Sequence, residues 1–395
     1  MVTLLFTAAA LVAFLDKAGN DLMVEARSAE AARLRPDAYS ALEVTLAVLE
    51  DFRQADGNAL RSPAEGWGDP LTWAGWTPSD PNRTLDVSFQ DESARIPLIH
   101  ADQTTLINLF ESAGYGQMGQ SDAQRLADAI LGWMQPTYTP VSAFQPDYEQ
   151  SVLPYDPPGR AMRSFSELAA IDIVRDTFFD ANGRPNNLWW QFCSDFSIFN
   201  FRGVNINGAN PDVLAAVGLF DERQQQDIAS YLAGTSNFST LGRRWFLSAA
   251  DLQTVTGPAG NLRAFVFTIR TLRITITVHD GKSLYKLSAV VAPQGGATTV
   301  QTTATDVKKA ASNSASGETT ATTTTNTASA ISTTPTAAQT ANAASANLQF
   351  PFTILEIREN DEILTPPPAP PQSPDDTSSL SPSPSPAVSA PAVHS

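Results

Sequence analysis

The side chains that could carry out covalent or acid–base chemistry are few and scattered along this sequence. Its single cysteine, Cys193, lies among Trp190, Phe192 and Phe196, with no histidine near it in the chain. A free cysteine in apolar surroundings is more often a small buried hydrophobe than a catalytic thiol. One cysteine also cannot form an intramolecular disulfide. We therefore interpret Cys193 as a packing residue.

The three histidines do not form a catalytic set. His100 follows a predicted strand, His279 lies in a predicted hairpin, and His394 lies in a tail rich in Pro and Ser. The chain has 41 Asp and Glu residues, so the choice of any one carboxylate pair for acid–base chemistry would be arbitrary. An enzyme needs a positioned nucleophile, base or metal. We therefore expect a protein that is not an enzyme.

The charge balance argues against nucleic acid as a partner. The formal net charge is -16, and no basic stripe is available to neutralise phosphates. The run from Gly203 to Val217, with a further helix predicted near 223–232, invites comparison with helix-hairpin-helix DNA-binding units. However, the turn between these helices contains Asp221 and Glu222, at the place where a phosphate would have to lie. We expect no nucleic-acid binding.

The elements that position these side chains begin with an apolar helix. The run from Val2 to Leu15 has no charge, Gly or Pro, and Asp16 and Lys17 end it. At 1.5 Å per residue it spans roughly 21 Å, less than the ~30 Å hydrocarbon core of a bilayer. The length fits a signal-peptide core, a buried helix, or a stem that inserts into a membrane or packs against other subunits. The stem is preferred, and its packing positions are Leu4, Leu5, Phe6, Leu11, Val12, Phe14 and Leu15.

The helix is expected to continue as an amphipathic segment to Phe52. Leu42, Leu46 and Leu49 recur at helical spacing, with charged residues between them. Pro36 should kink or briefly break the helix, and Gly57 should end it. The loop that follows is rich in turn residues, and its tryptophans are predicted to pack on the helix rather than form an aromatic sugar-binding platform.

Short elements fill the middle of the chain. Two alternating runs at 85–89 and 96–99 predict a β-hairpin. A block of short helices should follow. Its predicted helix starts are capped by Asp102, Ser121, either Ser164 or Ser166, Asn210 and Ser248.

The last part of the chain changes to a period of two. Residues 272–278 and 285–291 alternate between apolar and polar, and Asp280-Gly281 between them is a strong hairpin signal. Thr, Ala and Ser then dominate up to residue 346, a composition typical of disorder. A strand is predicted again from Leu348 to Ile357, so we interpret the segment before it as an insertion in a hairpin loop and expect the strand to return to the sheet.

These signals give a domain organisation in seven ranges. The predicted order is stem and long helix (1–57), loop and first strands (58–99), inserted helical domain (100–257), sheet hairpin (258–292), disordered insertion (293–347), last strand (348–364) and disordered tail (365–395).

Three motifs resemble the type II secretion system protein K family, the large minor pseudopilins. Asp91-Glu-Ser-Ala-Arg-Ile-Pro-Leu-Ile99 resembles the family's Asp-Glu-small-x-(Lys/Arg)-Ile-Asn-Leu-Asn run. The others are the Ser164 to Leu168 entry and Val204-Asn-Ile-Asn-Gly-Ala-Asn-Pro-Asp-Val-Leu214, which is the most specific. The positions that carry the resemblance are Asp91, Glu92, Ile96, Trp133, Asn205, Asn207, Ala209, Pro211 and Leu214.

The resemblance implies an α+β fold. A pilin-like N-terminal helix would pack on a small antiparallel sheet, with an inserted all-helical domain of SAM-like or helix-hairpin-helix-like form. It also implies a minor pseudopilin at the tip of the type II secretion pseudopilus, helping to start or cap the filament that exports folded proteins across the outer membrane. Partners would be the other minor pseudopilins. A transmembrane helix would hold the chain in the inner membrane, with its bulk in the periplasm.

Two departures from the family's pattern concern the start of the chain and calcium. Family precursors carry a short basic leader ending in Gly, which is not present in this sequence, so we expect a mature form or a misplaced start. Many members also have an Asp-Trp-x-Asp-x-Asp run that suits calcium. Here only Trp133 of that run remains. Asp147 and Glu149 could bind calcium weakly, but a solvated acidic loop is the preferred interpretation, and no metal or cofactor is assigned.

The alternative function is a membrane-anchored or secreted binding protein. In it the Thr/Ala-rich segment and the Pro/Ser-rich tail would act as spacers, which have no obvious place at a filament tip.

Overall fold

The structure, a computed structural model, describes most of the chain. The described residues are 2–142, 148, 155–235, 242–258, 260–281, 283–300 and 351–360, with the backbone alone at 2–10, 13, 26–28 and 30–31. Residues 301–347 of the predicted insertion at 293–347, the tail from 365 to 395, and Asp147, Glu149 and His394 lie outside these ranges.

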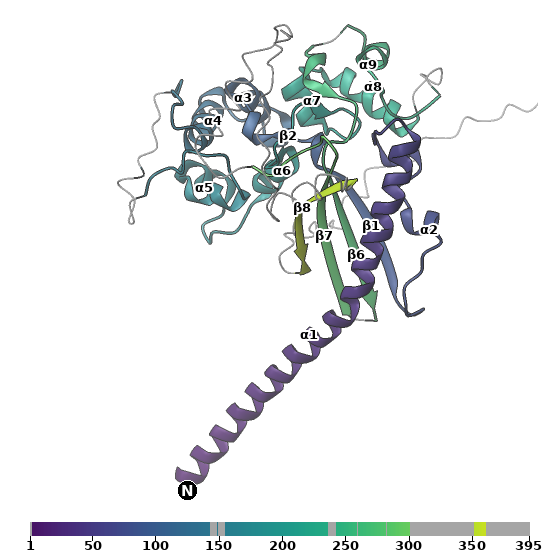
Figure 1. The fold of residues 1–395 in the computed structure, drawn as a ribbon. Coiled ribbons are helices and arrows are strands. Elements are labelled where there is room, and N and C mark those ends of the chain that lie inside the picture. Colours follow the sequence, from purple (N-terminus) through teal and green to yellow (C-terminus); the bar gives the residue numbers. More distant parts are fainter. Residues whose placement is uncertain are drawn as a thin grey trace, which may run out of the picture. The chain divides into compact units, whose positions relative to one another are not determined.

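The first element is a single long helix, α1 (Val2–Ala55), which Figure 1 shows in purple. The helix runs through Pro36 without the predicted break. Leu34 and Ala38 on either side of Pro36 are buried, so packing holds the backbone helical where a proline alone would open it. After the helix, Gly57 has a left-handed φ of 64°, as expected for a glycine that follows a helix end.

The second half of α1 packs on a four-stranded antiparallel sheet. The strands are β1 (Thr84–Asp91), β6 (Leu272–Asp280), β7 (Ser283–Pro293) and β8 (Phe352–Glu359), in the order β1-β6-β7-β8. The predicted hairpin is formed by β6 and β7, with Gly281 at a φ of 58° in its turn. β8, which follows the predicted insertion, pairs with β7 as expected. Figure 1 shows β8 at the edge of this sheet.

A core between α1 and the sheet follows from the two periodicities. Leu42 and Leu49 of α1 are buried against Ile274, Ile276 and Val278, which alternate along β6. The tryptophan loop packs on this core as predicted. It contains the short helix α2 (Pro70–Ala74), and Trp67 is fully buried with its ring edge-on to that of Phe89, at 5.0 Å between centroids.

The predicted hairpin between 85–89 and 96–99 is wrong. β1 pairs over its whole length with β6, and the two-residue β2 (Ile96–Pro97) pairs in parallel with β3 (Phe196–Ser197). Between β1 and β2, a 3-10 turn over Glu92–Ala94 is capped by Asp91 and leads the chain out of the sheet. Eight cross-strand pairs with β6 outweigh the local pairing that the short turn would have allowed.

A helical block lies between β2 and β6 in the chain. Its helices are α3 (Gln103–Phe110), α4 (Gln120–Met134), α5 (Asp172–Phe178), α6 (Asn187–Asp195), α7 (Pro211–Gly218), α8 (Glu222–Ala233) and α9 (Ala249–Thr256). The two-residue strands β4 (Val204–Asn205) and β5 (Phe265–Val266) pair in parallel within it. The block has its own apolar core, and it belongs with the sheet to one compact unit.

Most of the predicted helix starts are confirmed. Asp102, Asn210 and Ser248 each accept a hydrogen bond from the backbone N–H three residues on. Ser164 caps a 3-10 helix, Phe165–Ala170. Ser121 does not cap α4, which begins at Gln120 after Gly119. The helix α6, which carries Cys193, was not predicted.

The chain remains packed beyond residue 293, the predicted start of the insertion. Ala297 is buried with Phe199 and Phe201, and Thr298 pairs with Asn200 in an isolated β-bridge. The ordered chain therefore continues from β7 across to the helical block before the undescribed residues begin.

Candidate functional site

In the described part of the front half of α1, two groups of apolar side chains are exposed to solvent, separated by the polar run from Asp16 to Asp21. The exposed large apolar residues are Leu11, Val12, Phe14, Leu15, Leu22, Met23 and Val24. The exposed fraction is 59% for Leu11 and 70% for Leu22. For the other predicted stem positions, Leu4, Leu5 and Phe6, the structure describes only the helical backbone. No described helix combines the length and apolar character that crossing a membrane requires.

A second candidate site lies where the sheet meets the helical block. Here the structure brings together the two most specific sequence motifs. The Asn205 side chain is fully buried, and its Nδ2 donates to Asp91 Oδ2 at 2.6 Å and to the Arg61 carbonyl at 3.2 Å. Ser93 donates to Asp91 Oδ1 from its backbone N–H at 2.8 Å and from its hydroxyl at 2.5 Å. Burial raises the pKa of Asp91 to about 6.

Asn207 connects the same turn to the end of the helical block. Its Nδ2 donates to the carbonyls of Phe246 and Phe267, at 3.2 and 3.4 Å, and its Oδ1 accepts from the Phe246 N–H at 2.7 Å. The asparagines of the second motif thus hold loops together through backbone groups. This is a structural role that amide side chains suit, because each carries both donors and an acceptor.

Glu92 extends the junction across the sheet. Its carboxylate accepts from Arg95 at 3.0 Å and from Arg273 of β6 at 2.7 Å, while Arg273 also reaches Glu356 of β8 at 3.1 Å. Glu92 is buried, and two guanidinium groups compensate its charge. The network joins the turn after β1 to the last strand of the sheet.

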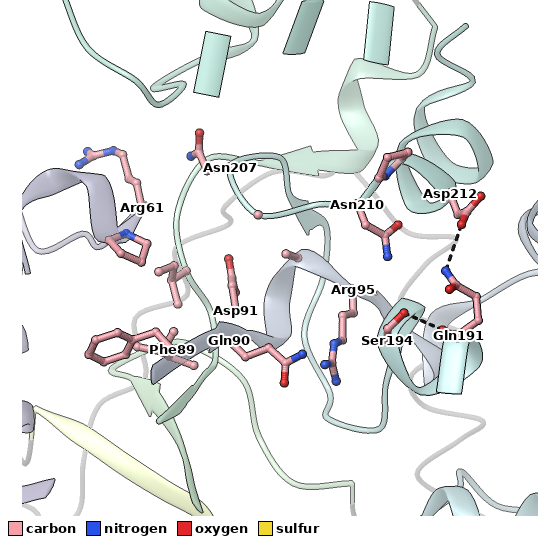
Figure 2. A pocket seen from close by; sticks show the side chains of 16 residues that line it. Arg61, Phe89, Gln90, Asp91, Arg95, Gln191, Ser194, Asn207, Asn210 and Asp212 are labelled. Atoms are coloured by element: carbon pink, nitrogen blue, oxygen red, sulfur yellow. Dashed lines mark hydrogen bonds between the residues drawn. The ribbon is translucent and has the colours of Figure 1, made fainter. Parts of the chain in front are cut away.

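A cleft of about 600 Å³ opens beside this junction. Figure 2 shows Gln90, Asp91 and Arg95 on one side and Asn207 and Asn210 on the other. Its lining residues are Arg61, Pro63, Phe89, Gln90, Asp91, Ala94, Arg95, Gln191, Ser194, Asn207, Gly208, Asn210, Pro211, Asp212, Ile269 and Leu272.

The polar groups of this cleft are largely satisfied by one another. Asp195 is buried and accepts from Asn210 Nδ2 at 2.5 Å and from the Tyr115 hydroxyl at 2.8 Å. Gln191 Nε2 donates to Asp195 and to Asp212 Oδ2, the latter at 3.0 Å. Burial raises the pKa of Asp195. The Ser194 hydroxyl shares its hydrogen bond between Asp195 Oδ1, at 3.2 Å, and the Gln191 carbonyl, at 2.8 Å. The arrangement fixes α6 against the start of α7.

The other motif positions are distributed through the core of the helical block. Ile96 and Leu214 are buried, Ala209 packs against the core, and Pro211 occupies the first turn of α7, where its missing N–H costs no bond. Trp133 lies apart from the junction, with its ring edge-on to Tyr148 and Tyr155. The structure therefore brings the polar motif residues together, but not Trp133.

Of the candidates for covalent or metal chemistry, Cys193 is a packing residue, whereas His279 is exposed on β6. Cys193 is half-buried against the core of the helical block, and burial raises its thiol pKa to about 12, far from that of a reactive thiolate. His100 Nε2 lies 2.9 Å from Asn200 Oδ1. Within the described residues, no group of three or more His, Cys, Asp or Glu could hold a metal ion.

Sequence reasoning missed two exposed residues of β8. Ile354 and Ile357 are 48% and 39% exposed, although their β7 partners Val291 and Ala289 are fully buried. The sequence signal for this exposure was an apolar strand late in the chain that is followed by no second apolar helix able to cover the strand. The first motif likewise gave no sign that Glu92 would pair with Arg273, which also binds Glu356.

Comparison with solved structures finds weak likenesses, whereas comparison with protein families and curated proteins finds none. The fold is similar to a chain of the crystal structure of the GspK-GspI-GspJ complex from the enterotoxigenic Escherichia coli Type 2 Secretion System. The TM-score is 0.45 at 10% identity, and the match covers 69% of this chain and 94% of the other. A likeness at this level carries no argument about fold or function.

Proposed function

We propose that this protein is a non-enzymatic, pilin-like subunit of a secretion filament, of the minor pseudopilin kind. The observation that carries the proposal is the division of α1. Its second half is buried on an antiparallel sheet, while its first half exposes seven large apolar side chains, in two groups at 11–15 and 22–24. So many exposed apolar side chains on one helix are costly in water, and burial against other apolar helices removes that cost.

The sequence motifs support the assignment to the large minor pseudopilins. The Asp91 and Val204–Leu214 motifs meet at the junction of sheet and helical block, where they form a buried hydrogen-bonded network. Such a junction fixes the orientation of an inserted domain relative to the filament-forming part. We further propose a place at the tip of the filament, with the front of α1 in the inner membrane before assembly and the bulk of the chain in the periplasm.

Gene deletion and complementation in the source cell test the function. Loss of the protein should abolish release of folded proteins across the outer membrane, and the wild-type chain should restore it. A chain carrying Leu15→Asp should fold but fail to restore release. Undiminished release without the protein would contradict the proposal and favour the spacer-bearing binding protein.

A further inference from the structure

The strand β1 forms a long and regular edge of the sheet. It comes first in the order β1-β6-β7-β8, so one of its two sides has no neighbouring strand among the described residues. It pairs with β6 in an unbroken antiparallel register from Thr84 to Asp91, and it contains no proline. The opposite edge is less regular, because the register of β8 with β7 shifts between Val290 and Val291. Bulges and prolines are two devices that protect strand edges, and β1 has neither.

The register shows which backbone groups face the open side of β1. Asp280 and Ser283 close the two-residue hairpin as a hydrogen-bonded pair, so the even-numbered residues of β6 bond to β7 and the odd-numbered ones bond to β1. Their partners on β1 are the even-numbered residues from Thr84 to Gln90. The N–H and C=O groups that point away from β6 therefore belong to Leu85, Val87 and Phe89. None of these groups has a backbone hydrogen-bond partner in the part of the chain that the structure describes.

The side chains of β1 define what this edge accepts. Leu85, Val87 and Phe89 are half-buried against the core between the sheet and α1. On the other face of the sheet, Asp86 is exposed and forms no ion pair with any described residue. A strand added at this edge would bury apolar side chains beside Val87 on one face and would place a side chain opposite Asp86 on the other.

The open edge leads into the cleft beside the junction. Phe89 and Gln90 are neighbours in β1 and both line the cleft, although neighbouring side chains of a strand point to opposite faces. Figure 2 shows these two side chains directed away from each other. A cavity that touches both must lie at the margin of the strand and not on one face of the sheet. The Gln90 carboxamide is exposed there and has no hydrogen-bond partner among the described residues, so it is available to a peptide group.

Charge argues against a second copy of this chain as the added strand. The formal net charge is -16, so two copies repel each other. Antiparallel pairing of two β1 strands about Val87 would also set the two Asp86 carboxylates on adjacent strands of one face, with no cation between them. The same charges favour a segment that brings a Lys or Arg.

We propose that the open edge of β1 binds an extended segment of another polypeptide as an added strand of the sheet. The segment carries Lys or Arg opposite Asp86, with an apolar residue on each side of it, and continues past Gln90 into the cleft. The main-chain groups of the edge supply the affinity, and the two faces supply the sequence preference. The inference goes beyond the proposed function and does not depend on it, because such an edge accepts an extended chain whatever the assembly to which the sheet belongs.

Site-specific photo-crosslinking in the source cell tests the proposal. Benzoylphenylalanine replaces Ser88 of the full chain, beside the open edge, or Leu284 as the matched control. Leu284 is 48% exposed on the same face, but it lies on β7, with β6 between it and β1. We expect position 88 to link to a segment of another protein in which Lys or Arg stands between apolar residues, and position 284 not to link to that segment. No link at position 88, or a link to a helix, to a second copy or to another part of this chain, would overturn the proposal.

Substitutions at the edge distinguish strand addition from other contacts. Val87→Pro removes an N–H that points away from β6, so it blocks an added strand and leaves the hydrogen bonds between β1 and β6 in place. It should lower the crosslink yield at position 88 about ten-fold, whereas Val87→Ala, which keeps the N–H, should lower it less than about three-fold.

Asp86→Lys should lower the same yield about five-fold by setting like charges opposite each other, and it remains informative if Val87→Pro unfolds, because Asp86 is exposed. Equal yields in Val87→Pro and Val87→Ala, or a yield unchanged by Asp86→Lys, would overturn the proposal. Neither variant alters the front of α1, so the release assay of Leu15→Asp tests the filament role separately.

Discussion

Asn205 and Asp91 lie 114 residues apart in the chain and are joined by a hydrogen bond of 2.6 Å from Nδ2 to Oδ2. The same amide donates to the backbone carbonyl of Arg61. One buried side chain thus connects the strand β1, the loop after α1 and the helical block. This bond explains why each motif carries a polar side chain at this position, although the position lies in the protein interior.

Removing this amide should weaken the whole junction. Asn205→Ala leaves a buried carboxylate oxygen and a buried carbonyl without their donor, at a cost of about 2 kcal/mol in the free energy of unfolding. Asn82→Ala, at an exposed loop position, should cost less than ~0.5 kcal/mol. Urea denaturation of the two variants measures both values. Equal stabilities would show that the junction does not depend on Asn205.

The contribution of Asp91 to stability should fall as the pH rises through the range in which Asp91 ionises. Burial raises the pKa of Asp91 from 3.8 to about 6 in the folded chain. The folded state therefore keeps this proton more tightly than the unfolded state does, so its contribution is complete below pH 3.8 and is lost towards pH 6. Asp91→Asn removes this titration. The stability of Asp91→Asn relative to wild type should rise between these pH values, and a constant difference would contradict the assignment.

The contact between Arg35 and Glu359 should have the opposite pH dependence. Hydrogen bonds from Arg35 and Tyr39 lower the pKa of Glu359 from 4.5 to about 2. The contribution of Glu359 is present above pH 4.5 and is lost as the pH falls towards 2. Because Arg35 is 55% exposed, solvent screening limits the loss in Glu359→Gln to ~0.5 kcal/mol at neutral pH. NMR titration of the Glu359 carboxyl checks the pKa directly, and a midpoint near 4.5 would exclude the contact.

The tryptophan loop should contribute to stability through Trp67 and not through Trp73. Trp67 is fully buried and edge-on to Phe89, whereas Trp73 is 64% exposed and its ring is tilted by 59° against that of Phe52. Trp67→Ala should therefore cost about 3–5 kcal/mol through the cavity it leaves, and Trp73→Ala no more than ~1 kcal/mol. Thermal unfolding of both variants compares them. A larger loss for Trp73→Ala would mean that the loop packs differently.

The sequence predicted those parts of the fold that local patterns determine. The hairpin at Asp280-Gly281 was predictable because its turn requires a positive φ next to two alternating strands. The caps at Asp102, Asn210 and Ser248 were predictable because their side chains bond to N–H groups only three residues away. The long helix followed from its composition.

The remainder depended on distant contacts. The pairing of β1 with β6 joins residues more than 180 positions apart, so the local turn after Asp91 was a misleading hairpin signal. Pro36 does not break α1 because the sheet holds both flanking turns, which no sequence window contains. Of the candidate site, the stem residues and motif positions were recognisable. Their meeting in one network, and the uncovered Ile354 and Ile357, required the sheet order.

The most direct test of the central claim is the state of association of the full chain purified from membranes of the source cell with a mild detergent. We expect a complex with other pilin-like subunits that survives gel filtration. Leu15→Asp and Leu22→Asp should each abolish this complex. The unfolding temperature of both variants should stay within about 2 °C of wild type, because these side chains contact no core. A wild-type chain that elutes alone, or stem variants that associate as well as wild type, would contradict the account.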